Sequence, residues 1–363
     1  QLLFLQSAVA KMDDHLGRAA IISNGSPLFT GGTASGESQI RRWLLENDLV
    51  EAIIQMPNDL FYNTGISSFC WVLSKNKRPE RIGKIQLIDA SGICHKLRKP
   101  LGSKKNEFTP EDRDTITKLY CNFEENEHSK IYNNTEFIYR EYTVMQPLQR
   151  SYGITDESME RLMQSGVLSK LYDEAKVLEL EEKGENMTAK EKAKLEDLRK
   201  SKQQYDNILD ALNAAKSEEK YMSPEAFLPV ISKVLPDVDS KLIDKIVDAL
   251  SVMDKSAEIQ REQKGKNKGE IIYDKDTKDT EIVKYDEDIE DYMAREVLPH
   301  IPDAKWFFEE NLAAKKPVIK TGAEIPFTRC FYKYQKQAKS EDIAARMAAL
   351  VKEAGKIEKR LFG

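Results

Sequence analysis

The fold is decided by the stretch Leu49-Val50-Glu51-Ala52-Ile53-Ile54-Gln55-Met56, which is followed directly by Pro57. A short apolar run that stops at a proline is typical of a buried strand. Three further runs of strand length lie around it, at residues 18–23, 69–73 and 84–89. Strands of this kind between helical segments predict an α/β fold with a largely parallel sheet. The connection between residues 56 and 69 is too short for a crossover helix, so that pair is predicted to be an antiparallel hairpin.

The composition argues against several classes of protein. The 363 residues carry 56 lysines and arginines against 61 aspartates and glutamates, a net charge of −5, so any nucleic-acid surface must be a local patch. No apolar run approaches the ~18 residues of a membrane span. The four cysteines are far apart and the four histidines form no ligand pair, so neither a disulfide framework nor a metal site is expected. A cytoplasmic protein with reduced thiols is expected.

The rest of the chain is predicted to be mainly helical. From about residue 155 helix formers and charges dominate, and Thr188-Ala189-Lys190-Glu191 is a capping box. After a polar loop at 261–269, residues 270–273 and 280–285 are predicted to form a hairpin. Apolar residues then repeat at steps of four and three, which predicts a terminal amphipathic helix: Ile343, Met347, Leu350, Ala354, Ile357, Leu361. We expect an α/β region at 1–150, a helical domain at 151–260 and a C-terminal region at 261–363.

The chain begins in a helical pattern that is already under way. Leu2, Leu5, Val9 and Met12 share one helix face, and no capping residue precedes them. We therefore expect that a further part of the protein precedes Gln1.

The loop between Pro57 and Ile66 is the most informative candidate site. It joins two predicted strands, and α/β proteins place their sites in loops at strand ends. Its central residues combine two aromatic rings with small and polar groups: Phe61, Tyr62, Asn63, Thr64, Gly65. They could supply a stacking face, hydrogen-bonding tips and a tight turn. On composition alone, a hairpin turn with buried aromatic rings is the more common meaning of such a loop.

Two other segments are weaker candidates. The cluster Lys264, Lys266 and Lys268 could contact a nucleic-acid backbone, but acidic residues flank it and favour a solvated loop. The glycine-rich loop from Gly31 to Gly36 precedes a helix, where backbone amides can bind phosphate. It lacks both the G-x-G-x-x-G spacing and a P-loop lysine, so an ordinary connector is expected.

A set of runs carries a family resemblance. It begins with Phe4-Leu5-Gln6-Ser7-Ala8-Val9 and Gly17-Arg18-Ala19-Ala20-Ile21-Ile22-Ser23-Asn24-Gly25, and it continues with Leu60-Phe61-Tyr62-Asn63-Thr64-Gly65-Ile66. It returns in Glu324-Ile325-Pro326-Phe327-Thr328-Arg329. These runs resemble, in order and spacing, the modification (methyltransferase) subunit of type I restriction-modification systems. The resemblance covers residues 1 to about 150 and about 270 to 363, and the middle helices are less diagnostic.

The resemblance implies a DNA adenine methyltransferase that transfers a methyl group from S-adenosylmethionine to the exocyclic amine of an adenine flipped out of the duplex. It implies that residues 1–150 are the C-terminal part of a Rossmann-like methyltransferase sheet, followed by a mainly helical domain. Phe61 then matches the position whose ring stacks on the target adenine, with Tyr62, Asn63, Thr64 and Gly65 around it. Phe4 matches a position that borders the adenine ring of the cofactor.

This sequence also departs from the family pattern. The family's glycine-rich cofactor loop and its Asn-Pro-Pro-aromatic motif occur nowhere in the 363 residues. We therefore expect S-adenosylmethionine to be bound mainly by residues outside this chain, and no catalytic residue within it. The chain alone is expected to be inactive.

The resemblance further implies partners. They are double-stranded DNA, a specificity subunit, a restriction subunit and a second copy of the modification subunit. The terminal helix could dock on the specificity subunit or pack on its own helical domain. The competing hypothesis is a non-catalytic helical scaffold that uses the α/β region as a platform. A different nucleotide-binding enzyme is disfavoured because the phosphate-binding glycine spacing is missing.

Overall fold

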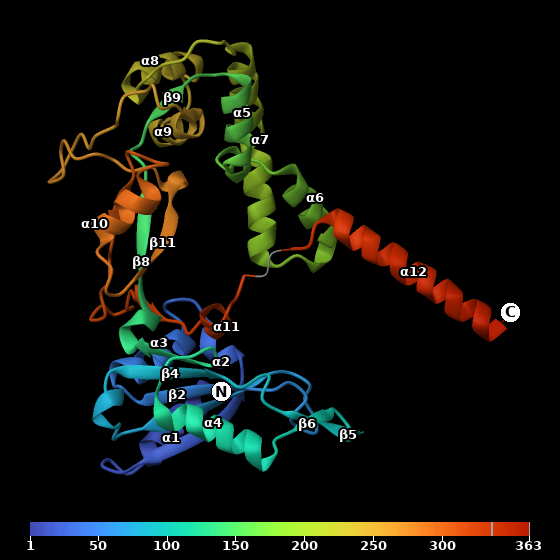
Figure 1. The fold of residues 1–363 in the computed structure, drawn as a ribbon. Coiled ribbons are helices and arrows are strands. Elements are labelled where there is room, and N and C mark those ends of the chain that lie inside the picture. The colour runs from blue at the N-terminus through green and yellow to red at the C-terminus, as the bar shows by residue number, and fades with distance from the viewer. Residues whose placement is uncertain (335–336, 363) are drawn as a thin grey trace. The chain divides into compact units, whose positions relative to one another are not determined.

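The computed structural model describes residues 1–334 and 337–362, which form two compact units. The first contains Gln1–Glu141, Ile282–Glu287 and Glu309–Gly363, and the second contains Tyr142–Glu281 and Asp288–Phe308. Figure 1 labels their helices and strands along the chain. No helix in the described ranges is both long and apolar enough to cross a membrane. The three-part division of the chain stays a prediction.

A five-stranded sheet with the order β1-β3-β2-β4-β7 forms the base of the first unit. The strands are β1 Arg18–Asn24, β2 Val50–Met56, β3 Ser68–Ser74, β4 Lys84–Asp89 and β7 Ser129–Asn133. The predicted β2–β3 hairpin is confirmed. The expected largely parallel sheet is wrong, because β3 lies between β1 and β2 and runs antiparallel to both. β7 is also antiparallel to β4, which leaves β2 and β4 as the parallel pair of this sheet.

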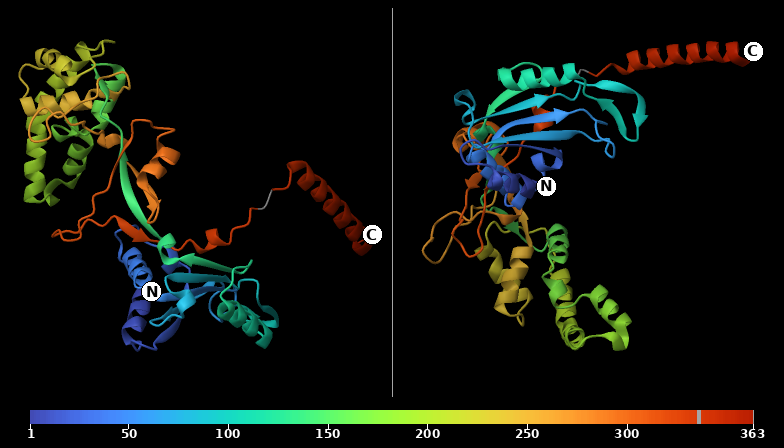
Figure 2. Two further views of the ribbon diagram at one scale, coloured as in Figure 1. Left: turned by 60° about the vertical axis from the view of Figure 1, so that its left-hand side comes forward. Right: turned by 90° about the horizontal axis from the view of Figure 1, so that it is seen from below.

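Helices cover this sheet, which confirms the predicted α/β fold class. They are α1 Leu2–Lys11, α2 Ser26–Phe29, α3 Gly36–Glu46 and α4 Pro110–Asn122. The right-hand view of Figure 2 shows α4 on one face of the sheet and α1 on the other. Local chemistry sets the helix starts: Ser35 caps α3, and Thr109 and Asp112 form a capping box on α4. The core is apolar, with Ile53, Trp71 and Leu87 fully buried.

The C-terminal part of the chain returns to the first unit. β13 (Thr321–Ala323) pairs antiparallel with the first residues of β8 (Ile138–Met145). The Ala323 N–H donates to Ser38 Oγ at 3.0 Å, and Arg41 Nε donates to the Ala323 carbonyl at 2.8 Å. In the short helix α11 (Phe327–Cys330), the Phe327 ring lies edge-on to Phe69 at 5.2 Å. The runs quoted for the resemblance, between residues 4 and 66 and at 324–329, therefore lie in one unit.

The second unit is mainly helical. Its helices are α5 Asp156–Gln164, α6 Glu174–Lys183, α7 Ala189–Ala214, α8 Pro224–Val234, α9 Ser240–Ala249 and α10 Ile289–Tyr292. The short strands β9 (Arg150–Tyr152) and β10 (Ser251–Met253) pair antiparallel, and β12 (Lys305–Phe307) pairs with the end of β8. Its main core buries Leu162, Leu212, Phe227 and Ile246. The predicted capping box at Thr188 starts α7.

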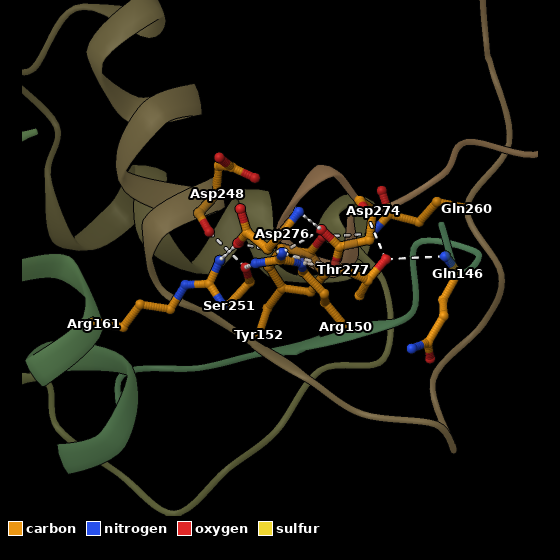
Figure 3. Close-up of polar contacts among 10 residues, drawn as sticks. All are labelled: Gln146, Arg150, Tyr152, Arg161, Asp248, Ser251, Gln260, Asp274, Asp276 and Thr277. Atoms are coloured by element: carbon orange, nitrogen blue, oxygen red, sulfur yellow. Dashed lines mark hydrogen bonds and ion pairs between the residues drawn. The ribbon is translucent and has the colours of Figure 1, made fainter. Parts of the chain in front are cut away.

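A buried ionic network joins three segments of the second unit (Figure 3). Arg150 makes a forked contact with Asp274, at 2.9 Å from Nε and 2.7 Å from Nη2. It also donates to Ser251 Oγ at 3.2 Å and to Asp276 at 2.7 Å. Arg161 reaches the same Asp276 carboxylate at 2.6 Å. These contacts join β9 to the segment that follows residue 273 and to β10.

The predicted hairpin of 270–273 with 280–285 is wrong in its first strand. Residues 270–272 pair instead with 260–262: the Ile272 N–H donates to the Gln260 carbonyl and the Glu262 N–H to the Glu270 carbonyl, at 3.0 and 2.9 Å. The lysine loop 263–269 is therefore the turn between these two segments. The second predicted strand exists as β11 (Asp279–Lys284).

The predicted terminal helix is confirmed as α12 (Ser340–Phe362). Its apolar stripe is exposed within the described chain, with Ile343, Met347, Leu350 and Ile357 each at least half exposed.

Candidate functional site

An open cavity of about 680 Å³ in the first unit is lined by three of the predicted site residues, Phe4, Phe61 and Thr64. Its volume falls within the about 300–1,000 Å³ typical of small-molecule sites. It is lined by the start of α1, the end of β1 and the loop between β2 and β3: Gln1, Phe4, Leu5, Ser7, Ile21, Ile22, Ser23, Asn24, Pro27, Phe61, Thr64, Ile66, Ser68. None of these side chains carries a charge, so the cavity suits neutral, flat ligands.

Phe61 lies on the cavity wall and is half-buried. A backbone bridge between Phe61 and Thr64 closes the loop tightly around Tyr62 and Asn63. The loop is fixed at its base, where Ser67 Oγ donates to Asn58 Oδ1 at 2.6 Å. The ring therefore lines an open cavity, and the backbone that carries it is held in place. A stacking residue needs both properties.

The aromatic ring of Phe4 is 72% exposed and lines the same cavity from α1. Its helix neighbours Leu2 and Leu5 are buried in the core and hold α1 in place. Ile22 and Ile66 are also more than half exposed there. Large apolar side chains that are exposed together in one cavity mark an interaction site.

The other predicted residues of the loop have different positions. Tyr62 and Asn63 are exposed and do not line the cavity, and the Tyr62 ring has Lys104 Nζ 5.1 Å from its centroid. A Cβ at Gly65 would lie 2.9 Å from the carboxylate of Asp59, so a larger residue there would displace that side chain. Asp59 has a left-handed backbone (φ 54°), so this part of the loop turns sharply.

Residues at the end of β1 were missed as site residues by the sequence reasoning. Ser23 and Asn24 supply polar groups to the cavity wall. Ser23 Oγ accepts from Trp71 Nε1 at 3.2 Å, and Asn24 Oδ1 accepts from the Ser26 N–H at 3.1 Å. The available signal was a pair of polar residues directly after an apolar strand, the usual position of α/β sites.

The three lysines of the polar loop lie in the second unit. All are exposed, and Lys264 borders a cavity of about 550 Å³. Three carboxylates line that cavity as well, those of Glu225, Glu258 and Glu262. The predicted contact of this loop with DNA stays a prediction.

Comparison with known proteins finds a family match in the N-terminal part of the chain. Residues 1–153 match the N-6 DNA methylase family. The chain is 35% identical over 108 residues to the type I restriction enzyme MjaVIII methylase subunit of Methanocaldococcus jannaschii, which covers 30% of this chain and 18% of that protein. It is 33% identical over 94 residues to the HindI methylase subunit of Haemophilus influenzae, covering 26% and 19%. The chain therefore matches less than a fifth of the length of either relative.

A solved type I restriction-modification methyltransferase subunit from Streptococcus thermophilus aligns over 38% of this chain and 27% of that chain. The identity is 25% and the TM-score 0.33. The sequence matches confirm the resemblance drawn from the residues.

Proposed function

We propose, from the premise that residues 1–153 belong to the N-6 DNA methylase family, that this chain forms the target-base side of a DNA adenine methyltransferase subunit. The observation that carries the proposal is the open cavity that Phe4 and Phe61 both line. A helical scaffold does not require two aromatic rings that line one solvent-exposed cavity. The relatives named above are methylase subunits of type I restriction enzymes, and we extend that role to this chain.

The chemistry explains why an aromatic wall is needed. The exocyclic amine of adenine is a weak nucleophile, and an active site cannot enclose it for chemistry while the base stays stacked in the duplex. The base must therefore leave the stack, at a cost of a few kcal/mol, and be held elsewhere. Stacking on an aromatic side chain returns about 1–3 kcal/mol per base. Phe61 offers such a ring, while Ser23 and Asn24 can hydrogen-bond to the edge of a purine.

We propose that the cavity also holds part of the cofactor. S-adenosylmethionine, when bound, supplies the methyl group from its sulfonium. Phe4 would border its adenine ring, because the uncharged lining suits a purine. The same lining offers no charged side chain to the amino-acid end of the cofactor. We therefore propose that this chain contributes to cofactor binding through Phe4, with tight binding dependent on residues outside it.

The test replaces Phe61 in the modification complex that contains this chain. Phe61→Ala should lower target-base binding at least about tenfold, because about 1–3 kcal/mol of stacking is lost. The measurements are fluorescence of 2-aminopurine at the target position and transfer of a tritiated methyl group. Phe61→Tyr keeps the ring and should restore both signals. Wild-type methylation by Phe61→Ala, with unchanged circular dichroism, would show that the ring has no such role.

We also propose that α12 docks on the specificity subunit. Its exposed stripe of Ile343, Met347, Leu350 and Ile357 repeats at heptad spacing, which suits a helix–helix contact. Removing residues 340–363 should abolish co-purification with that subunit. Retained co-purification would assign the stripe to packing within this chain.

A further inference from the structure

The hairpin of β5 (His95–Leu101) and β6 (Lys104–Glu107) concentrates positive charge in the first unit. Residues 95–107 contain five cationic side chains, Lys96, Arg98, Lys99, Lys104 and Lys105, against one acidic residue, Glu107. The whole chain has a net charge of −5, so this short hairpin stands out against an acidic background. Such a local patch is the electrostatic feature expected of a nucleic-acid contact.

The sheet topology brings the hairpin to the loop that carries Phe61. β2 and β4 run parallel, with Gln55 opposite Asp89, and the Ala90 N–H donates to the Gln55 carbonyl at 3.0 Å. Both strands therefore end at the same edge of the sheet. The Phe61 loop follows β2 and the hairpin follows β4, so the two segments leave this edge side by side.

Direct contacts hold the hairpin against the Phe61 loop. The Ser103 N–H donates to the Tyr62 carbonyl at 3.1 Å, and the Asn106 N–H donates to the Asp59 carbonyl at the same distance. Lys105 Nζ lies 3.4 Å from the Asp59 carboxylate. Lys104 lies over the Tyr62 ring. The position of the hairpin is therefore tied to the loop that carries the candidate stacking residue.

The remaining cations of the hairpin are available to a ligand. Lys96, Arg98 and Lys99 are exposed, and within the described parts of the chain their side chains make no hydrogen bond or ion pair. Lys264, in contrast, shares its cavity with Arg261 and three carboxylates, and the excess of negative charge weakens the attraction for an anion. A phosphate backbone would gain more from the hairpin than from the lysine loop.

We propose that the β5–β6 hairpin binds the sugar–phosphate backbone of DNA beside the cavity, through Lys96, Arg98 and Lys99. The proposal rests on the proposed function, because the hairpin would hold the DNA strand whose base leaves the duplex and stacks on Phe61. Phosphate contacts position a duplex without reading its sequence. The hairpin would thus anchor the backbone next to the flipped nucleotide, while the cavity holds the base.

The experiment measures anisotropy of a fluorescent, fully paired 30-base-pair duplex titrated with the 363-residue chain over a range of KCl concentrations. Each lost phosphate contact lowers the slope of log affinity against log salt by about 0.9. The triple variant Lys96→Gln/Arg98→Gln/Lys99→Gln should reduce the slope by about two to three and the affinity at least about tenfold. The matched control is Lys264→Gln/Lys266→Gln/Lys268→Gln, which removes the same charge from the second unit and should change both values much less.

Three results would overturn the proposal. Equal losses from both triple variants would mean that only net charge matters, and a loss from the lysine-loop variant alone would assign the contact to that loop. Binding of the hairpin to phosphatidylserine vesicles in preference to DNA would assign it to a membrane surface.

The outcome is separable from that of the proposed function. Phe61→Ala is scored by 2-aminopurine fluorescence and methyl transfer, whereas the hairpin is scored by the salt slope on paired DNA. Either readout can therefore fail while the other holds.

Discussion

Arg150 in the second unit and the cations of the β5–β6 hairpin in the first unit represent two opposite uses of positive charge. Arg150 is 3% exposed, and its donors are occupied by Asp274, Asp276 and Ser251. Lys96, Arg98 and Lys99 are exposed, and within the described residues their side chains form no ion pair with an acidic residue. A cation whose donors are already used holds segments of its own chain together, whereas one without partners is free for a ligand. Charge alone would not separate these two roles.

The largest effect is expected from removing the acidic partner of the buried cation, Arg150. Asp274→Ala should lower the free energy of unfolding of the second unit by about 3–5 kcal/mol, because it leaves the Arg150 charge buried and poorly compensated. Urea unfolding followed by circular dichroism measures the loss. The hairpin triple variant should leave this value unchanged.

Asp276→Ala is the matched control for that variant. Asp276 bridges the same arginine, but its side chain is 63% exposed, so its loss should cost no more than about 1 kcal/mol. Similar losses from both variants would mean that burial does not set the strength of this network.

The smallest effect is expected at the base of the hairpin. His95 Nδ1 lies 2.8 Å from the Asp112 carboxylate, and this hydrogen bond raises the pKa of His95 above 6.5, with smaller contributions from Glu111 and Glu107. The protonated ring adds a sixth positive charge to the hairpin. DNA affinity should therefore fall a few-fold as the pH rises through this raised pKa, and His95→Gln should remove the step. Anisotropy titrations between about pH 6 and 8 test it, and an identical pH profile for His95→Gln would show that His95 does not contribute.

The pair of His95 and Asp112 stabilises the fold over a pH range that is limited on both sides. The raised pKa of His95 means that its contribution is complete below the pKa of the unfolded chain and is lost as the pH rises through the folded value. The pKa of Asp112 is lowered, first by the Thr109 backbone N–H and then by His95. Its contribution is therefore present above its unfolded pKa and is lost as the pH falls through the lowered value.

The strands of the first unit could be predicted because their signal is local. Runs such as residues 49–56 are apolar and end at a proline, and those properties do not depend on the rest of the chain. The direction of pairing could not be predicted in the same way. The insertion of β3 between β1 and β2 depends on how Trp71 and its neighbours pack in the core. The wrong hairpin has a similar cause, because residues 270–272 pair across the lysine loop, which looked like a linker.

For the site, the sequence by itself determined which groups are available: the aromatic rings of Phe4 and Phe61, the small residues after Phe61, and the match of residues 1–153 to the N-6 DNA methylase family. These are properties of single residues and short runs. Only the tertiary structure decided that the two rings, separated by two strands and two helices, line one cavity. It also decided that a basic hairpin contacts the loop that carries Phe61. The reason is that the parallel pairing of β2 with β4, together with the packing of α1, sets which loops meet at the sheet edge, and no local pattern encodes that pairing.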